Sequence, residues 1–564
     1  MKRLLILSVM MIFAVGAVFA GGDAEAGSTE ERGPIKVKVL FDTETTETSL
    51  DSDIGQMIYD ALGVEIESVT FSGDRREKAL TMLAGQDFGD LDIMVVANHA
   101  NATKYIAAGA LVNLDDYKDK LPNYYSYCAE YIPYLRLYDP EGGLYLWQAG
   151  PDIKVGELPY DMIVRSDVLE ALDWPRLDTT GDYVDFLEKA LEMFPETDGL
   201  KTIGMTVPGN GTLGTRLLSY LPRHGGFQMA TPYGVYIDVD NDKYVSLPES
   251  PYYKETLRFW NELSRKGLLD PEAFTSTLGD QGEKMKAGYS VVNFFPHWLV
   301  RAANLELEAT GRENMQYITL PIRLDISKEN RKARYEASYT IRPDNLTGIL
   351  SSAPQENIER IIEVVNFMSS EEMTLRLGWG KENDHYTVAG DSQRTLTDEF
   401  YRLQKNDPDR LNAIRGSFLR TLFPTKNNGI TSNGQSSRAE GSVVYGAAST
   451  TKRQQEVLNA YGWNNYLSPW KDSEYFDFQY YDVTLAFSAS ILDPNSDIGF
   501  KSDSCALLLD ELYPLVVIAK TEAEFEARYA DMVAQIKKAG IDDVVDFIND
   551  NYSKTAEKIA GFGG

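Results

Sequence analysis

The chain has 564 residues, 43% of them hydrophobic and 25% charged, which is typical of a globular protein and not of a disordered or fibrous one. This length exceeds what a single hydrophobic core supports, so two or more domains are expected. With 55 basic and 85 acidic side chains the formal charge is −30, which opposes binding to nucleic acid and to anionic lipid surfaces and suits a neutral or cationic ligand.

Residues 1–20 have the pattern of a secretory signal peptide. A short basic start precedes an apolar run over residues 4–19, and small residues at positions 18 and 20 predict cleavage before Gly21. The apolar run is shorter than the ~20 residues of a membrane span. No cysteine stands near the cleavage point for lipid attachment, so we expect a periplasmic protein without a lipid anchor. Residues 21–33 are small and acidic and predict a disordered leader.

Strands and helices alternate at the start of the mature chain. β-Branched, alternating segments predict strands at 35–41, 64–69 and 91–96, and helical spacing predicts helices at 52–62, 74–84 and from about 99 to 108. This order is typical of an α/β domain with a parallel sheet, in which ligands bind beyond the carboxyl ends of the strands. The polar loops at those ends contain Glu44 and Asn98, which we predict to be partners for ligand hydroxyl groups.

A second α/β pattern follows Trp147. Strands are predicted at 161–165 and 202–207, and helices at 166–172, 181–194, 212–221 and 251–266, with Ser166 as the N-cap of the first helix. Further helices are predicted at 357–368 and over the tail from 521 to 559, where basic residues precede a glycine stop at Gly540. The sequence therefore predicts two α/β units and additional C-terminal helices.

Several motifs occur in a collinear order that is itself informative. They are the strand–helix segment 163–172 with Arg165 and Asp167, the stretches 180–187, 194–199 and 203–206, the segment 274–289 ahead of Trp298, the glycine-rich stretch 378–387 and the C-terminal segment 525–545. In this order they resemble the bacterial family 1 extracellular solute-binding proteins. The glycine-rich and C-terminal stretches are similar to a large subgroup that includes alginate-oligosaccharide and complex-glycan binders.

This resemblance implies a two-lobed periplasmic-binding-protein fold of class II, each lobe a mainly parallel sheet flanked by helices. It places 34–151 and 325–377 in lobe 1 and 155–322 and 385–564 in lobe 2, with crossings near 150–158, 321–335 and 377–385. It also implies a monomeric receptor, without catalysis or a cofactor, that captures an oligosaccharide between the lobes and delivers it to the permease of an ABC importer. A peptide or another small solute is the alternative ligand.

Aromatic side chains are the expected platforms for sugar rings, because sugars have apolar faces. Trp298 stands where the family carries a stacking tryptophan, and Trp147, Trp379 and Tyr386 lie near predicted loops or crossings. Trp463 and Trp470 border a polar stretch and are weaker candidates, as lid residues. Any of these tryptophans can instead be a core residue.

Metal and disulfide chemistry have little support in the sequence. Some alginate-binding relatives carry an acidic calcium loop near the position of 195–201, but here that stretch supplies only Glu196 and Asp198 as carboxylates, so no metal is expected. Cys128 and Cys505 are the two cysteines of the chain. An oxidising compartment permits a bond between them, and two buried thiols are the equal alternative.

The sequence admits two enzyme interpretations. The spacing of Gly209, Gly211 and Gly214 after a strand matches a dinucleotide-binding fingerprint, but the segment 222–226 interrupts the βαβ unit that such a site needs. A secreted glycan-active hydrolase that uses a carboxylate pair is the main alternative to a receptor. Nothing in the sequence singles out one pair among its 85 acidic residues.

Overall fold

The computed structural model describes most of the chain, and all structural statements below concern that part. It comprises residues 32–41, 46–71, 75–96, 99–149, 152–153, 162–209, 221, 227–229, 234–238, 241, 243–294, 299–327, 346–390, 393–426, 428–439, 450–465, 468–471, 485, 489, 491–493 and 495–562. The predicted signal peptide and nearly all of the predicted leader lie outside it. None of the described helices is long and apolar enough to cross a membrane.

The first body, which we call lobe 1, is built on a five-stranded sheet of order β2-β1-β3-β15-β4. Strands β1, β2 and β3 are parallel to one another, β15 is antiparallel to β3, and β4 is antiparallel to β15. One strand of the five is therefore reversed. Their bounds are Ile35–Leu40 (β1), Val64–Val69 (β2), Ile93–Val95 (β3), Leu346–Ile349 (β15) and Trp147–Gln148 (β4).

The lobe 1 helices begin and end at residues that explain their limits. The Ser52 hydroxyl caps α1 (Asp53–Leu62) by accepting a bond from the Gly55 amide, and the helix ends at Gly63 with φ 62°, a conformation that glycine adopts readily. Alternate residues of the strands, such as Val37, Val39 and Ile66, are fully buried with those of the covering helices. The other helices here are α2 (Arg75–Gly85), α3 (His99–Ala107), α4 (Pro122–Tyr127), α5 (Ile132–Leu135), η3 (Arg136–Tyr138), α12 (Gln355–Met368) and α13 (Glu371–Trp379).

The second body, lobe 2, is built on a four-stranded sheet of order β14-β6-β13-β9. Strand β6 is antiparallel to both of its neighbours, and β13 is parallel to β9, so again a single strand is reversed. The bounds are Tyr317–Leu320 (β14), Met162–Arg165 (β6), Ser290–Phe294 (β13) and Ile203–Thr206 (β9). Its helices are α6 (Ser166–Ala171), α7 (Thr180–Met193), α9 (Pro251–Arg265), α10 (Leu278–Lys286), α11 (Leu299–Ala309) and α17 (Lys452–Tyr461).

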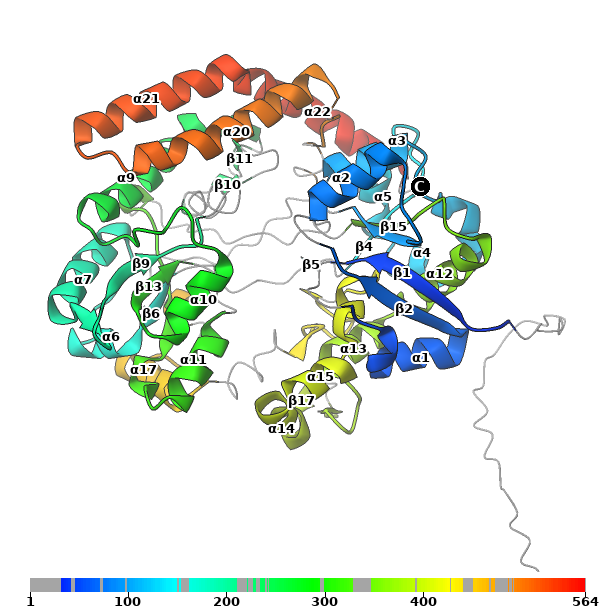
Figure 1. Cartoon of the computed structure of the whole chain (residues 1–564), viewed down its shortest axis with the longest axis horizontal. Helices are drawn as coiled ribbons and strands as arrows, with labels where there is room; N and C mark the ends of the chain where they lie inside the picture. The colour runs from blue at the N-terminus through cyan, green and yellow to red at the C-terminus, as the bar shows by residue number, and fades with distance from the viewer. Residues whose placement is uncertain are drawn as a thin grey trace, which may run out of the picture.

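Three long helices end the chain, of which α20 and α21 lie over lobe 2 and α22 runs from them toward lobe 1 (Figure 1). They are α20 (Asp497–Val517), α21 (Glu522–Ala539) and α22 (Ile541–Phe562). The predicted helical tail is divided at Gly540, where φ is 103°. Asn261 of α9 donates to the backbone oxygens of Val517 and Ala519 at 2.9 and 2.7 Å, which fastens the end of α20 to the lobe. Helix α20 was not among the elements predicted from the sequence.

Smaller elements complete the structure. They are β5 (Asp152–Ile153), β7 (Glu196–Thr197), β8 (Leu200–Lys201), β10 (Phe227–Met229), β11 (Val235–Asp238), β12 (Lys243–Ser246), β16 (Tyr386–Val388), β17 (Arg394–Leu396), α14 (Asp398–Asn406), α15 (Pro408–Ile414), β18 (Asn428–Gly429), α18 (Ser468–Lys471) and the short 3-10 helices η1 (Ser49–Asp51), η2 (Leu114–Lys120), η5 (Leu247–Glu249), η6 (Glu313–Met315), η7 (Asp325–Ser327) and η9 (Ser417–Thr421).

The predicted fold class is confirmed: two mainly parallel sheets, each flanked by helices, are followed by additional C-terminal helices. One local prediction is wrong. Ser166 lies inside α6, whose N-cap is Arg165, and the Ser166 hydroxyl donates to the Asn314 backbone oxygen instead of capping the helix. The short α6 therefore begins against η6 without a side-chain cap.

The predicted division into lobes came from the resemblance alone. Contacts among the described residues show on which lobe several of these segments pack. Residues 321–327 stay with lobe 2, because the Arg323 backbone bonds to Asp178 and Thr180 at the start of α7. The segment from α14 to η9 packs on lobe 1, where Arg415 donates to the Leu377 backbone oxygen at 3.1 Å and Arg410 pairs with Asp53 at 2.8 Å. Helix α17 packs on α6 and β14 of lobe 2. The predicted lobe 2 segment 385–564 thus has contacts with both lobes.

Candidate functional site

The carboxyl ends of the parallel strands and the chain crossings share one edge of each sheet. The reversed strands explain why. Strand β6 is the first of lobe 2 after the chain leaves β4, and β15 is the first of lobe 1 after it leaves β14. A chain that enters a lobe at the edge where parallel strands end must run backwards through the sheet. The loops that bind ligands in open α/β sheets therefore lie beside the crossings.

Figure 1 shows this arrangement, with the sheet of each lobe on its own side and β5 between them. On the first crossing, β5 pairs in parallel with β18, joining Asp152 to Asn428 and Ile153 to Gly429. The loops directly after β1, β3 and β13 contain Glu44, Asn98 and Trp298, and all three residues lie outside the described part of the chain. Their contact with ligand stays a prediction.

Trp147 is part of the lobe 1 core in this structure. Its side chain is 0% exposed, its indole N–H donates to the Leu422 backbone oxygen at 2.8 Å, and its ring is nearly parallel to that of Phe423, with 6.4 Å between centroids. In this structure Trp147 is therefore a core residue, which the sequence analysis gave as the alternative to a ligand contact. A stacking contact with a sugar would require Phe423 to move.

Trp379 and Tyr386 share a smaller buried cluster beside lobe 1. The rings are 5.8 Å apart, the Trp379 indole donates to the Ser436 backbone oxygen at 3.1 Å, and the Arg394 guanidinium lies 5.3 Å from the Trp379 ring. Their exposed fractions are 0 and 5%. The two rings are in contact, and neither offers a face to solvent.

A partly exposed aromatic pair lies on lobe 2 at the end of β14. Trp463 stacks on Tyr461 with 4.1 Å between centroids and 12° between planes, and the Tyr461 hydroxyl donates to the Pro175 backbone oxygen at 2.9 Å. Both rings line a small recess with Leu320 and Pro321. We call this pair the aromatic shelf. Trp470, the other weak candidate, is fully buried.

A cavity of about 540 Å³ lies on lobe 1 beside β18, which we call the hinge pocket. Its volume is in the range of small-molecule sites. One wall is α4 and the facing wall is the chain on either side of β18. The lining residues are Asn123, Ser126, Tyr127, Ser369, Ser370, Glu371, Lys426, Ile430, Thr431 and Ser432.

The hinge pocket presents charged, hydroxyl and aromatic groups held in place by the protein. The Lys426 ammonium pairs with Glu130 at 2.6 Å and lies 4.7 Å from the centre of the Tyr127 ring. Both carboxylate oxygens of Glu371 accept bonds from Ser432, at 2.7 and 3.0 Å. Burial raises the pKa of Tyr127 well above its usual value, and the nearby Glu371 adds to the rise. A neutral ligand with many hydroxyl groups suits this mixture better than an ion does.

Comparisons with known proteins agree on the architecture. No family model matches the sequence, and no curated protein matches it. The structure is similar to an HMO binding ABC-transporter associated solute binding protein from Bifidobacterium longum infantis, with TM-score 0.61, 17% identity and coverage of 93% of this chain and 99% of that chain. It is also similar to the alginate-binding protein AlgQ2, with TM-score 0.61, 15% identity and coverage of 92% and 98%.

A third similar structure is the Streptococcus pneumoniae ABC-transporter substrate binding protein FusA in complex with kestose, with TM-score 0.59, 14% identity and coverage of 93% and 99%. The chain has the fold of ABC-transporter solute-binding proteins. At such low identity the match concerns the fold and leaves the ligand open.

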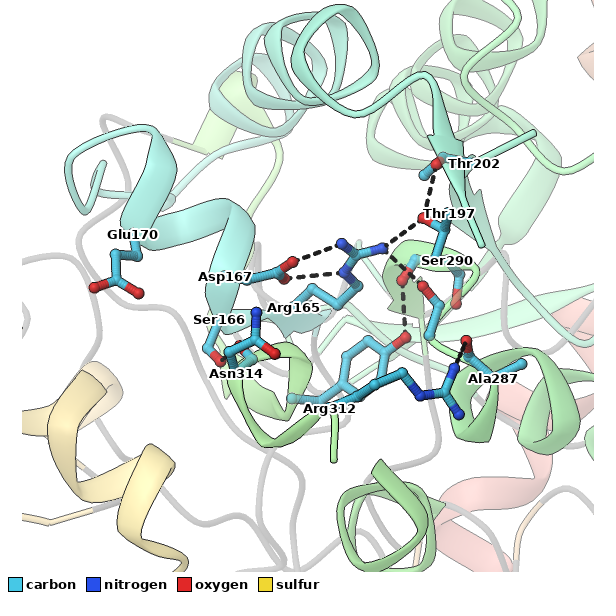
Figure 2. Close-up of polar contacts among 12 residues, drawn as sticks. Arg165, Ser166, Asp167, Glu170, Thr197, Thr202, Ala287, Ser290, Arg312 and Asn314 are labelled. Atoms are coloured by element: carbon cyan, nitrogen blue, oxygen red, sulfur yellow. Dashed lines mark hydrogen bonds and ion pairs between the residues drawn. The ribbon is translucent and has the colours of Figure 1, made fainter. Parts of the chain in front are cut away.

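Arg165, from the strand–helix motif, is a structural centre of lobe 2 (Figure 2). Its guanidinium is 2% exposed and makes two bonds to the Asp167 carboxylate, at 2.7 and 3.0 Å. It also donates to the Thr197 hydroxyl at 3.1 Å and to the Gly288 backbone oxygen at 2.7 Å. The residue joins three separate segments of lobe 2, so its place in the strand–helix motif has a structural reason.

The stretch 195–201, which the resemblance compares with a calcium loop, forms the hairpin of β7 and β8. Asp198 at its tip has φ 50° and pairs with Arg312 at 3.1 Å, so a guanidinium already faces this carboxylate. Among the described residues, no group of three or more His, Cys, Asp or Glu side chains is placed to hold a metal.

The glycine at the start of the fingerprint-like spacing has a packing role. A Cβ on Gly209 would lie 1.9 Å from the Ala273 backbone oxygen, so only glycine lets these two backbones approach. The Tyr513 hydroxyl donates to the Gly209 oxygen at 3.3 Å, which adds α20 to the same contact. Gly211 and Gly214 lie outside the described residues.

The two cysteines are separate buried thiols. Cys128 belongs to the lobe 1 core and Cys505 to the lobe 2 core, and neither forms a disulfide. Burial raises the pKa of Cys128 to about 12 and that of Cys505 to about 11. Both thiols are therefore protonated and poorly reactive at neutral pH.

Proposed function

We propose that this protein is the extracytoplasmic receptor of an ABC importer, which captures an oligosaccharide between its lobes and delivers it to the permease. The observation that carries the proposal is the coincidence of strand carboxyl ends and chain crossings at the facing edges of two separate α/β cores. A ligand held there contacts both cores and the hinge at once. Similarity to glycan-binding solute-binding structures over almost the whole chain supports the same proposal.

The mechanism follows from the separation of the two cores. Each lobe has its own buried cluster, so the lobes can rotate as rigid bodies about the crossings without exposing apolar side chains. A ligand that contacts both lobes in the closed arrangement stabilises that arrangement by its differential affinity. The permease then recognises the closed form, and the sugar leaves unaltered.

Three crossings connect the lobes in this proposal. The first runs between β4 and β6 and includes β5, and the second joins Ser327 of lobe 2 to Leu346 of lobe 1. The third is proposed between Ala439 and Thr451, whereas the resemblance implied a crossing near 377–385. This position is supported by Ala439, which packs in the cluster of Trp379, and by Thr451, whose hydroxyl donates to Gln316 of lobe 2 at 2.6 Å.

The proposed ligand contacts come from both lobes. On lobe 2, the partly exposed Trp463 of the aromatic shelf would cover one sugar face, because an aromatic ring supported by a second ring stays flat and ordered. On lobe 1, the hinge pocket would take hydroxyl groups. Trp298, Glu44 and Asn98 remain proposed contacts from the loops outside the described residues. Trp147, Trp379 and Tyr386 would contribute only if their present cover were displaced.

The deciding experiment is titration calorimetry of the mature protein with a panel of kestose, alginate oligosaccharides and milk-type oligosaccharides, followed by chromatography of the recovered sugar. Binding with the sugar recovered intact supports a receptor. Shortened sugar would overturn the receptor assignment in favour of a glycan hydrolase, and no binding across sugars but binding of peptides would overturn the sugar assignment. N-terminal sequencing of the exported protein tests cleavage before Gly21.

The aromatic shelf has its own test. Trp463→Ala should weaken sugar binding by about tenfold, which corresponds to ~1.4 kcal/mol and is the order expected for one aromatic stacking contact. Phe500→Ala is a matched control, because Phe500 is an aromatic residue on α20 that is 60% exposed and lies outside the shelf. If Trp463→Ala binds as tightly as the control, the shelf is not part of the site.

A further inference from the structure

The C-terminal helix α22 contacts both lobes. Its first half is buried in lobe 2, where Ile541, Val544 and Ile548 belong to the core. Asn549 anchors it further, since its side chain accepts a bond from the Tyr244 amide at 2.8 Å and donates to the Tyr244 oxygen at 3.0 Å. Figure 1 shows the helix, in red, running from the other C-terminal helices toward lobe 1.

The second half of α22 reaches lobe 1. It contacts α5 and η3, and the ring of its last residue, Phe562, lies directly on Gly142. A Cβ at Gly142 would be 2.5 Å from Phe562 Cε1, and Gly142 has φ 80°. Glycine at this position therefore creates the seat on which the ring rests. The α22 tip is a non-covalent connection between the lobes, separate from the three crossings of the chain.

The helix is too stiff to absorb lobe rotation by itself. Its 22 residues correspond to about 33 Å at 1.5 Å per residue, and between Ile541 and Gly561 it contains neither glycine nor proline, the usual causes of a kink. The base is held by three core residues and a paired asparagine. The tip contacts lobe 1 through α5, η3 and Gly142, so rotation of the lobes must be taken up there.

We propose that α22 is an interlobe latch. Its tip, seated on Gly142, stabilises the lobe arrangement of this structure, and the seat must open or shift when the lobes rotate relative to one another. The proposal rests on the proposed function, because a latch matters only if the lobes move. The latch would set the free energy of this lobe arrangement relative to the closed arrangement. It would thereby set the apparent affinity for ligand, because the apparent affinity of a receptor is proportional to the population of its binding-competent state.

The test is an interlobe distance measurement on ligand-free protein. Cysteines introduced by Asp119→Cys in lobe 1 and Glu192→Cys in lobe 2 are exposed and can be spin-labelled, whereas both native thiols are buried. Double electron–electron resonance should give one narrow distribution for the parent. Phe562→Ala, and a truncation after Ser553, should give a broader distribution with a new maximum. Phe547→Ala, an exposed aromatic residue on the same helix, should behave as the parent.

A second variant separates the contact from general damage. Gly142→Ala should displace the Phe562 ring and broaden the distribution in the same way. Combined with Phe562→Ala, it should add no further broadening, because the ring it displaces is already gone. Unchanged distributions in Phe562→Ala and in the truncation would overturn the latch. This outcome is independent of the sugar panel, which can succeed or fail without reference to α22.

Discussion

Replacing Arg165 by methionine should destabilise lobe 2 strongly while leaving its packing volume nearly unchanged. The guanidinium is 2% exposed, and the partner Asp167 carboxylate is 12% exposed. Removing one member of such a buried pair leaves an uncompensated charge, which typically costs about 3–5 kcal/mol. The variant also loses the hydrogen bonds to Thr197 and Gly288, because methionine has no donor group. The cost of these two bonds is included in the range given for breaking the buried pair.

The assay is urea unfolding followed by both fluorescence and near-ultraviolet circular dichroism, since two lobes need not unfold in one step. Arg402→Met is the matched control. Arg402 makes the same two-bond contact with a carboxylate, at 2.6 and 2.7 Å to Glu399, but the two side chains are 54 and 44% exposed. An exposed pair is worth about 0.2–1 kcal/mol, so this variant should lie near the parent.

The double variant Arg165→Met with Asp167→Asn should recover part of the loss, because it removes the stranded charge. A single-variant cost below ~1 kcal/mol, equal to that of the control, would refute the reasoning. It would mean that Asp167 finds solvent or another donor once the guanidinium is gone. Ligand binding by the folded single variant should be unchanged, since Arg165 contacts only other segments of lobe 2.

Gly209→Ala should destabilise the protein by about 1–3 kcal/mol in thermal unfolding, as overpacking against a backbone does, whereas Gly279→Ala on α10, whose Cβ meets nothing closer than 3.6 Å, should be neutral or stabilising. Burial alone would raise the pKa of Asp115, but its bonds from an arginine and a tyrosine outweigh burial and lower it. Asp115→Asn should therefore lower stability at pH 7, and the difference from the parent should vanish as pH falls below the usual carboxyl range. Thiol titration should find Cys128 and Cys505 unreactive in the native protein and two thiols per denatured chain without reductant.

The first strands and helices of lobe 1 could be predicted closely because their signals are local, whereas β4, β15, α4 and α5 of the same lobe were not predicted. The strand at 64–69 has its predicted bounds, and α1 ends at Gly63 as its periodicity indicates. The direction of a strand within its sheet, by contrast, cannot be predicted from the local sequence. Nothing in the sequence of β6 or β15 shows that each is reversed, because direction depends on the edge at which the chain enters the sheet.

The glycine-rich stretch 378–387 shows a second limit of local patterns. It looks like a crossing, with a turn at Gly380, where φ is 86°. In the structure the turn folds the chain back, and His385 accepts a bond from the Lys381 amide at 2.9 Å to close it. A turn motif predicts that the chain changes direction, but it does not predict on which lobe the following segment packs. Here that is decided by Trp379, Phe400 and Ile414 packing together.

The exposure of the tryptophan side chains could not be predicted from the sequence, for a related reason. Trp147 and Trp463 stand in similar local sequence, each next to polar residues, yet one is fully buried and the other is partly exposed. Exposure depends on neighbours distant in the sequence, such as Phe423 over Trp147. The position of a ligand-binding edge, by contrast, follows from topology alone. In this chain the crossings after β4 and β14 begin at the carboxyl ends of the parallel strands, whichever side chains line the loops there. The similarity at 14–17% identity is accordingly a similarity of fold.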